Sequence, residues 1–292
     1  MTQPLRERVA AYVRELQDRI CAALESVDGE AKFREDRWRR EGGGGGITRV
    51  MEGGAVFEKA GVNTSEVFGA VPSALAGHMK GEGAEFYATG VSLVLHPHNP
   101  HVPTVHANYR FLARGDRGWF GGGADLTPFY PVEEDVRHFH RTLKAACDEH
   151  DPAFYPRFKA WCDEYFSLPH RGEMRGVGGI FFDELPGDEA SFDLLRSTGD
   201  AFLPAYLPIV ERRRASHWTK EERSWQLHRR SRYAEFNLIY DRGTTFGLRS
   251  HGRIESILMS LPPLARWGYD VQPAPGSAEE RATAFYQPRD WA

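Results

Sequence analysis

The strand-like segments in the middle of this chain are joined by connections that are mostly too short to hold a helix. The expected strands cover about residues 85–96, 104–114, 119–125, 176–183, 232–241 and 244–250. Parallel neighbours in a sheet need a crossover connection of about a dozen residues or more, so neighbouring strands here should pair antiparallel. With helical patterns between and after the strands, we expect an α+β fold, an antiparallel sheet covered by helices.

Helical periodicity begins near the amino terminus, where apolar residues recur every three or four positions from residue 5 to residue 24. Further helices are expected at about residues 132–147, 153–168, 189–214, 220–229, 253–260 and 278–286. A length of 292 residues lies within the range of large sheet-based folds. We therefore predict one domain that spans residues 1–292.

Composition excludes several classes of protein. The longest apolar runs, VSLVL and GIFF, are too short to span a membrane. The amino terminus lacks the apolar region of a signal peptide, and the three cysteines form no CxxC pair, which favours a cytoplasmic location. A formal net charge of -4 argues against nucleic acid as a partner.

A run of glycines at residues 42–46 is followed by two strand-like stretches around Gly53 and Gly54. The second glycine pair is a hairpin turn signal. The run at residues 42–46 lacks the lysine of a phosphate-binding loop and leads into a strand, so we expect either a flexible linker or a mobile lid over an active site.

The segment TVHANYRFLAR, residues 104–114, alternates with a period of two. His106, Asn108 and Arg110 point to one face of the expected strand, and the apolar residues point to the other. Ser92 and His96 of the preceding strand can line up beside them. Such alternation is typical of a solvated sheet face, but Ser, Asn, His and Arg in place of Lys, Glu and Thr favour a binding face.

The stretch WFGGGADLTPFY, residues 119–130, places three glycines between aromatic residues. Glycine weakens a strand interior and leaves bare backbone, which marks a place where something flat or bulky comes close. A planar ring system is the natural ligand of such a strip, with Asp125 at one end of it. The alternative role of Asp125 is to cap the turn or helix that follows Pro128.

Histidines at positions 96, 98, 101, 106, 140 and 170 raise the question of a metal site. The chain has no HExxH motif, and no local pair completes a facial triad. His140 falls on the inward side of its expected helix, where a buried histidine with satisfied hydrogen bonds is the simpler interpretation. The spacing leaves both interpretations open.

Several segments resemble the oxygen-dependent coproporphyrinogen III oxidases. The likeness is carried by WFGGGADLTPFY, GVSLVLHPHNP, PTVHANYR, WCDEYFSLPHRGEMRGVGGIFFDEL, YLPIVERR, YAEFNLIYDRGTTFGL and RIESILMSLPP. The resemblance implies a large, flat antiparallel sheet with helices on both faces. It also implies a homodimer that joins through about residues 233–268.

The reaction that the resemblance implies belongs to haem synthesis. Two propionates of coproporphyrinogen III are oxidatively decarboxylated to vinyl groups, which yields protoporphyrinogen IX, carbon dioxide and hydrogen peroxide. Dioxygen is the co-substrate, and no haem, flavin or nicotinamide is expected. Two rival functions are a histidine-ligated metalloenzyme that acts on another polycarboxylate and a tetrapyrrole carrier without catalysis.

The resemblance also assigns residues. The implied catalytic residues are His106, as proton donor, and Asp125, at the centre of the macrocycle. The implied substrate-binding residues are Ser92, Asn108, Tyr109, Arg110, His251, Gly252 and Arg253. The implied ligands of a divalent metal cation are His96, His106, His140 and His170. The loop reads SHGRIES, with His251 where a small residue is more usual, which weakens the expectation of backbone contacts there.

A carboxylate at the centre of a porphyrinogen can accept hydrogen bonds from the pyrrole N–H groups. Such contacts raise the electron density of a pyrrole, and an electron-rich pyrrole can react with dioxygen. We expect Asp125 to have this role.

Overall fold

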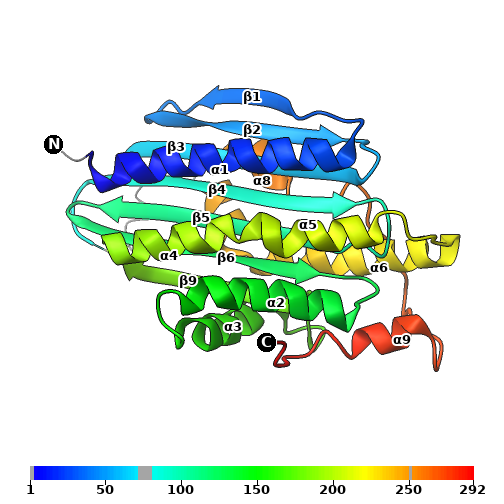
Figure 1. Cartoon of the computed structure of the whole chain (residues 1–292). Helices are drawn as coiled ribbons and strands as arrows, with labels where there is room; N and C mark the ends of the chain where they lie inside the picture. The colour runs from blue at the N-terminus through cyan, green and yellow to red at the C-terminus, as the bar shows by residue number, and fades with distance from the viewer. Residues whose placement is uncertain (1–2, 72–80, 250–251) are drawn as a thin grey trace.

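The fold is built around one large antiparallel sheet. The computed structural model describes residues 3–71, 81–249 and 252–292. Seven strands follow the order β1-β2-β3-β4-β5-β6-β9, and every neighbouring pair is antiparallel (Figure 1). The strands are β1 (Arg34–Arg39), β2 (Gly44–Glu52), β3 (Phe57–Ala70), β4 (Glu85–Pro97), β5 (Thr104–Arg114), β6 (Arg117–Thr127) and β9 (Gly178–Pro186). A small second sheet pairs β7 (Ser167–Leu168) with β8 (Glu173–Met174).

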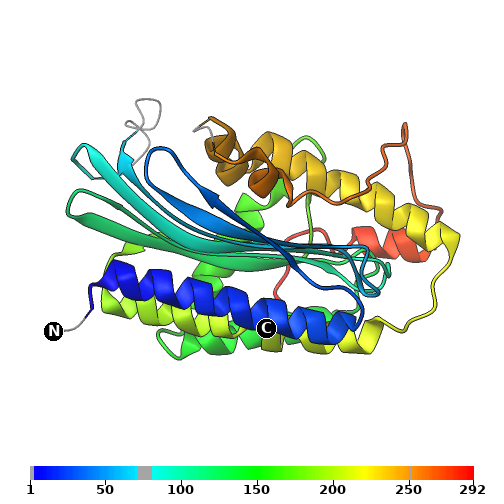
Figure 2. The same ribbon diagram turned by 90° about the horizontal axis from the view of Figure 1, so that it is seen from above.

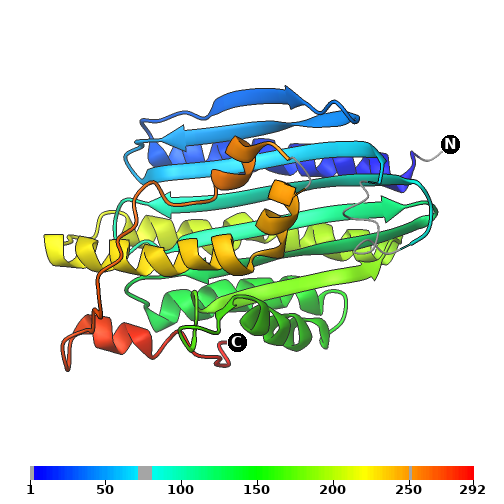
Figure 3. The same cartoon turned by 180° about the vertical axis from the view of Figure 1, so that it is seen from behind.

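Helices cover both faces of the large sheet (Figure 2). One face carries α1 (Leu5–Asp28), α2 (Glu133–Asp148), α4 (Glu189–Asp200) and α5 (Phe202–Arg213), and α3 (Phe154–Tyr165) packs beside β9. The other face carries α6 (Lys220–Glu235), the π-helix η2 (Phe236–Tyr240), α7 (Arg242–Arg249) and α8 (Ile254–Leu258), as Figure 3 shows from behind. The last helix is α9 (Ala278–Thr283). The predicted α+β fold, an antiparallel sheet with helices on both faces, is confirmed.

The hydrophobic core lies between the sheet and the helix layer that contains α1. Tyr109 of β5 and Phe120 of β6 are fully buried in it. The alternating residues of β5, including Asn108, are partly exposed on the opposite face, as the period-two pattern predicted. The core therefore takes one face of β5 and leaves the other for polar side chains.

The predicted amino-terminal helix is confirmed, and α1 buries its apolar stripe against the sheet. It ends at Gly29, which has a φ of 78° and therefore adopts the left-handed conformation that glycine accepts most easily. The preceding residue, Asp28, accepts hydrogen bonds from the N–H groups of Ala55, Val56 and Phe57. This carboxylate joins the end of the helix to the start of β3. None of the described helices is long and apolar enough to cross a membrane.

The glycine run is neither a linker nor a lid, because residues 44–46 form the start of β2 and pair with residues 65–67 of β3. A β carbon at Gly46 would lie 2.4 Å from the ring of Trp38, so glycine allows this ring to lie against the strand. The predicted hairpin turn is confirmed at Gly53, whose N–H donates to the carbonyl of Glu58.

Two predicted strands are wrong. Residues 232–241 lie mainly in α6 and η2, and residues 244–249 lie in α7. Helix α6 starts at a capping box, in which the side chains of Thr219 and Glu222 each accept a hydrogen bond from the backbone N–H of the other residue. Once started, it continues into the short apolar run FNLIY, which periodicity alone cannot assign to helix or strand. The predicted helix at residues 189–214 is two helices that meet at Ala201.

Candidate active site

A row of polar side chains crosses the sheet on the face that carries α6 and α8. In the strand register, Ser92 of β4 lies directly between Asn63 of β3 and Asn108 of β5. Asn108 lies opposite Gly123 of β6. Directly paired residues of antiparallel strands have their side chains on the same face, with β carbons about 4.5–5.5 Å apart. The register therefore brings Ser92 and Asn108 together.

His106 and Asp125 are direct neighbours across β5 and β6. Nδ1 of His106 lies 2.9 Å from Oδ1 of Asp125. An ionised carboxylate only accepts hydrogen bonds, so Nδ1 is assigned the proton and donates it. Within the described parts of the chain, no hydrogen bond engages Nε2, and the side chain of His106 is 21% exposed. The arrangement presents one oriented imidazole nitrogen to a ligand on this face.

Arg175 holds the other side of the Asp125 carboxylate. Its Nε donates to Oδ2 at 3.0 Å and its Nη2 donates to Oδ1 at 2.8 Å, and both side chains are only 1% exposed. Nη1 donates to Oδ1 of Asn237 at 3.0 Å. The guanidinium carbon also lies within 4.7 Å of three ring centroids, those of Phe166, Tyr233 and Phe236. The buried cation is stabilised by the carboxylate at its edge and by aromatic rings over its faces.

Asp125 and Arg175 each shift the pKa of the other. Burial alone would raise the pKa of Asp125, but Arg175 and the hydrogen bond from His106 outweigh it, so the pKa lies below its ordinary value. Burial would lower the pKa of Arg175, but Asp125 reverses this effect and the pKa is raised. Both groups are therefore charged at neutral pH.

The expected contact of Asp125 with pyrrole N–H groups is not available in this conformation. The carboxylate accepts three hydrogen bonds from His106 and Arg175, out of roughly four that a carboxylate can accept. It is also buried below the surface of the polar face. Among the described residues, Asp125 is joined to the surface of the site through His106, whose side chain is partly exposed.

Arg110 connects Asn108 with Asp183 of β9. Its Nη1 donates to Oδ1 of Asn108 at 2.9 Å, and its Nη2 lies 2.9 Å from Oδ2 of Asp183. This ion pair lies over Gly121, where a β carbon would be 2.5 Å from Oδ1 of Asp183 and 2.9 Å from Nη2 of Arg110. The prediction of bare backbone under a flat ligand is therefore wrong at Gly121, because side chains of the protein fill the space.

The other two glycines of the strip serve strand packing. A β carbon at Gly122 would point into the core and lie 3.0 Å from the rings of Phe182 and Tyr109. Gly123 has a φ of 153°, and a β carbon there would lie 2.1 Å from the carbonyl oxygen of Ile180 on β9. Glycine is needed at Gly123 because the backbones of β6 and β9 approach closely.

Three of the implied substrate-binding residues, Tyr109, His251 and Gly252, are not among the residues on the polar face of β5. The side chain of Tyr109 is buried in the core, and its hydroxyl donates to the carbonyl of Thr198 at 2.8 Å. The structure therefore contradicts a substrate contact by this side chain, which alternation turns away from its neighbours in β5. The N–H of Gly252 donates to the carbonyl of Gly247 at 2.8 Å. His251 lies outside the described residues.

Arg253 lies towards the β1 edge of the sheet and pairs with Asp36 of β1. Four strand spacings separate β1 from β5, or about 19 Å at 4.8 Å per spacing. Between these strands, α8 packs on the polar face. The hydroxyl of Ser256 lies 2.7 Å from the hydroxyl of Thr48, and the backbone carbonyl of Ser256 accepts a hydrogen bond from the side chain of Asn63. The structure thus places Arg253 and the pair His106–Asp125 at separate positions on one face.

The four histidines implied as metal ligands lie in separate places. His140 is on α2, on the far side of the sheet from His106, and burial lowers its pKa to about 3. Both ring nitrogens are engaged in three of the four. The partners are Thr104 and Ser260 for His96, Tyr155 and Val177 for His140, and Tyr240 and Glu235 for His170. In the described residues no group of three or more His, Cys, Asp or Glu side chains could hold a metal ion, so this donor set does not fit one shared site.

Sequence reasoning did not find two residues of the site, Arg175 and Asp183. Arg175 lies in the segment PHRGEMRG without a motif that marks it, and Asp183 directly follows the buried run GIFF. A charged residue directly after a fully apolar run within a strand is a weak signal for a site there. The partner of Arg175 lies 50 residues away, and the partner of Asp183 lies on β5, so both contacts depend on the tertiary arrangement.

A model of the coproporphyrinogen III oxidase family matches residues 8–291 of this chain. The match spans all strands of the sheet and every site residue described above. The chain therefore belongs to the coproporphyrinogen III oxidase family.

Proposed function

We propose that the protein is an oxygen-dependent coproporphyrinogen III oxidase. Membership of the family supports coproporphyrinogen oxidase activity and a role in porphyrin biosynthesis. The observation that supports the detailed chemistry best is the group His106, Asp125 and Arg175, which holds an oriented imidazole on a polar sheet face. Arg110, Asn108 and Ser92 on the same face supply the polar contacts that a polycarboxylate needs.

The reaction converts two propionates of coproporphyrinogen III to vinyl groups and gives protoporphyrinogen IX. In each conversion the bond to the carboxylate carbon breaks, carbon dioxide leaves, and the electron pair of that bond forms the new double bond. The carbon beside the ring loses a hydrogen together with its bonding pair. Dioxygen takes that hydrogen and pair, and with one further proton it becomes hydrogen peroxide.

His106 is the proposed source of that further proton. Its Nδ1–H is held by Asp125, so Nε2 is the nitrogen that faces the ligand. Asp125 acts through His106 and is therefore a positioning residue in this proposal, kept charged and in place by Arg175. General acid help of this kind is typically worth about 100 to 10,000-fold in rate.

Arg110 is the proposed partner of one substrate propionate. We expect Arg110→Ala to raise the Michaelis constant, because it leaves a carboxylate unpaired in the site. A change in turnover alone would contradict this assignment. Arg253, with Gly252 and His251 beside it, is proposed for a further propionate on the α8 side of the same face, and Arg253→Ala should act in the same way.

The proposal also includes a cytoplasmic homodimer that uses dioxygen and needs no haem, flavin or nicotinamide. Because the four histidines do not form a shared metal site, no step is assigned to a divalent cation. We expect dialysis against a chelator to leave turnover unchanged. Loss of activity that returns with a single added metal would show that a metal site exists elsewhere and would favour the metalloenzyme alternative.

One assay tests the proposed function. The purified protein is incubated with coproporphyrinogen III in air and, separately, without oxygen, and products are followed by chromatography and oxygen consumption. We expect protoporphyrinogen IX only in air, with one dioxygen used for each vinyl group. A carrier would return its ligand unchanged under both conditions, and product formation without oxygen would refute oxygen dependence.

A further inference from the structure

The ion pair of Arg110 and Asp183 has the chemistry of a bound substrate carboxylate. Arg110 is the cation that the proposed function assigns to a propionate, and Asp183 already offers it a carboxylate oxygen at 2.9 Å. The second oxygen of Asp183 accepts from the N–H of Glu184, also at 2.9 Å. The aspartate therefore occupies the position on Arg110 that an incoming carboxylate would take.

The backbone around Asp183 is shaped to bring this carboxylate over the strand. Between Phe120 and Gly122 the register of β6 and β9 shifts, so Asp183 and Glu184 together face Gly121. Two residues opposite one make a β-bulge, a device that re-aims side chains beside functional sites. Glu184 has a φ of 58°, a left-handed conformation that is unfavourable for residues other than glycine.

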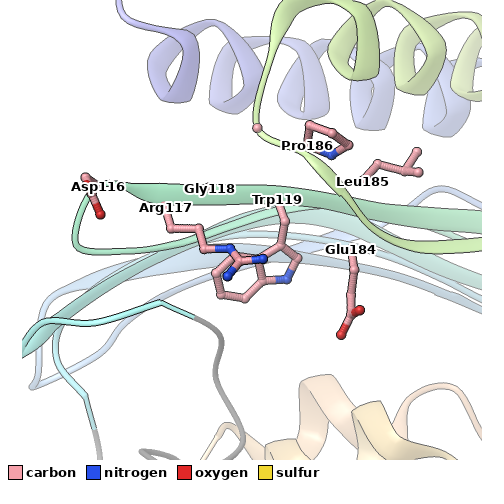
Figure 4. A pocket seen from close by; sticks show the side chains of 8 residues that line it. Asp116, Arg117, Gly118, Trp119, Glu184, Leu185 and Pro186 are labelled. Carbon is pink, nitrogen blue, oxygen red and sulfur yellow. The ribbon is translucent and has the colours of Figure 1, made fainter.

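The bulge also borders open space. A pocket of about 400 Å³ begins at Glu184 and is lined on the β6 side by Arg117 and Trp119 (Figure 4). In this view the three side chains extend to the same side of β6 and β9. The Asp183 carboxylate itself is 18% exposed and Arg110 is 29% exposed, so a ligand can reach the pair and compete for it.

The two arginines nearest to the polar residues of β5 are each paired with one carboxylate. Arg175 is paired with Asp125, and Arg110 is paired with Asp183. Arg253 is likewise paired, with Asp36, so among the described residues every arginine assigned to a substrate carboxylate already has a carboxylate partner. The two pairs differ in access, because the first is buried and the second is partly exposed. Only the second can exchange its partner without opening the core.

We propose that Asp183 is an internal competitor for the substrate-binding arginine, a carboxylate that a substrate propionate must displace from Arg110. The inference rests on the proposed function, because it assumes that Arg110 receives a substrate carboxylate. A ligand with a carboxylate in the correct place can replace Asp183, whereas a neutral analogue leaves the pair intact. The aspartate thus lowers the affinity for ligands whose carboxylate must compete for Arg110, and it leaves the affinity for a neutral analogue unchanged.

The test compares the wild type with Asp183→Asn, which keeps the shape of the side chain and removes its charge. Binding is measured by fluorescence with coproporphyrin III, an already oxidised tetracarboxylate, and with its tetramethyl ester. We expect Asp183→Asn to bind the acid about 3- to 10-fold more tightly, with a steeper dependence on salt, and to bind the ester as the wild type does. Unchanged or weaker binding of the acid would overturn the inference.

Two controls separate this role from a general change of charge. Glu184→Gln removes the same formal charge one residue along, and it should leave the affinity for the acid within twofold of the wild type. In an Arg110→Ala background, Asp183→Asn should have no further effect, because the two residues act as a pair. Equal tightening in that background, or in Glu184→Gln, would also overturn the inference.

The proposed function and this inference can fail separately. Binding is read with an oxidised ligand that needs no turnover, whereas the function is read by conversion of coproporphyrinogen III by the wild type. A wild type that binds the acid and forms no vinyl product would refute the function alone. A converting wild type whose Asp183→Asn variant binds no more tightly would refute the inference alone.

Discussion

At the scale of single residues, the site depends on a charge that is buried below the polar face of the sheet. Asp125 lies between the guanidinium of Arg175 and the imidazole of His106. Its carboxylate fixes which ring nitrogen carries a proton, and the arginine fixes the carboxylate. The orientation of the exposed nitrogen is therefore set by two residues below the surface.

Loss of this charge should be visible in stability. We expect Asp125→Asn to lower the free energy of unfolding at pH 7 by about 3–5 kcal/mol, because it leaves a buried arginine unpaired. Urea denaturation measures the difference. A double variant, Asp125→Asn with Arg175→Met, should recover part of the loss, and no recovery would show that the pair is not its origin.

The same pair predicts a pH dependence. The pKa of Asp125 is lower in the folded protein than its unfolded value near 3.8, so its stabilising effect is fully present above that pH. It is lost as the pH falls through the folded pKa. The difference in unfolding free energy between wild type and Asp125→Asn should therefore be constant from neutral pH to about pH 5 and should shrink at lower pH. A difference that grows on acidification would contradict the assignment.

His106 should affect the rate more than binding. We expect His106→Ala to lower turnover by about 100 to 10,000-fold with a small change in the Michaelis constant. Added imidazole should restore part of the rate, because it can occupy the space beside Asp125. His138→Ala is the matched control, since His138 lies on α2 and bonds the carbonyl of Pro204. Equal losses in both variants would exclude the role of proton donor.

At the scale of elements, sequence periodicity predicted those helices and strands that bury a single face. The alternation in β5 and the apolar stripe of α1 both correspond to one buried face, so they were readable from the sequence. The helical structure of residues 232–249 was not readable in this way, because the apolar run FNLIY fits a helix or a strand. The capping box at Thr219, which starts the helix, lies more than ten residues earlier in the chain. The glycines of β6 were noticed in the sequence, but their role was misassigned, because the groups of β5 and β9 that fill the space beside them are distant in sequence.

These glycines predict a contrast between two variants. In Gly121→Ala the new methyl meets movable side-chain ends of Arg110 and Asp183, so the protein should fold normally and show a changed Michaelis constant. In Gly123→Ala it meets the backbone of β9, so we expect a loss of about 2 kcal/mol or more of unfolding free energy. Thermal melting and steady-state kinetics distinguish the two, and identical behaviour would contradict this interpretation.

At the scale of the whole molecule, the exposed apolar surface is concentrated in one part of the chain. Large apolar side chains that are more than a third exposed gather between residues 238 and 271, within and just beyond the region expected to form a dimer. They are Leu238, Ile239, Leu248, Ile254, Leu264, Trp267, Tyr269 and Val271. A concentration of exposed large apolar side chains is typical of a segment that forms a protein interface.

This surface predicts the oligomeric state. We expect the wild type to sediment as a dimer and Ile239→Glu to sediment as a monomer, because the variant would bury a charge in the interface. Phe68→Glu is the matched control: it exchanges an apolar side chain of similar exposure on β3 and should leave the dimer intact. A monomeric wild type in analytical ultracentrifugation would contradict the prediction.

The strict alternation along β5 has a consequence for how such a gene can change. Deleting a single codon in the middle of this strand would move every following side chain of the strand to the wrong face of the sheet. Aromatic rings would then face water, and an arginine would point into the core. The hydrophobic core and the polar site would be lost together. Variation in length among descendants of this protein should therefore be confined to the ends of the strand, while point substitutions on the polar side alter the chemistry and leave folding intact.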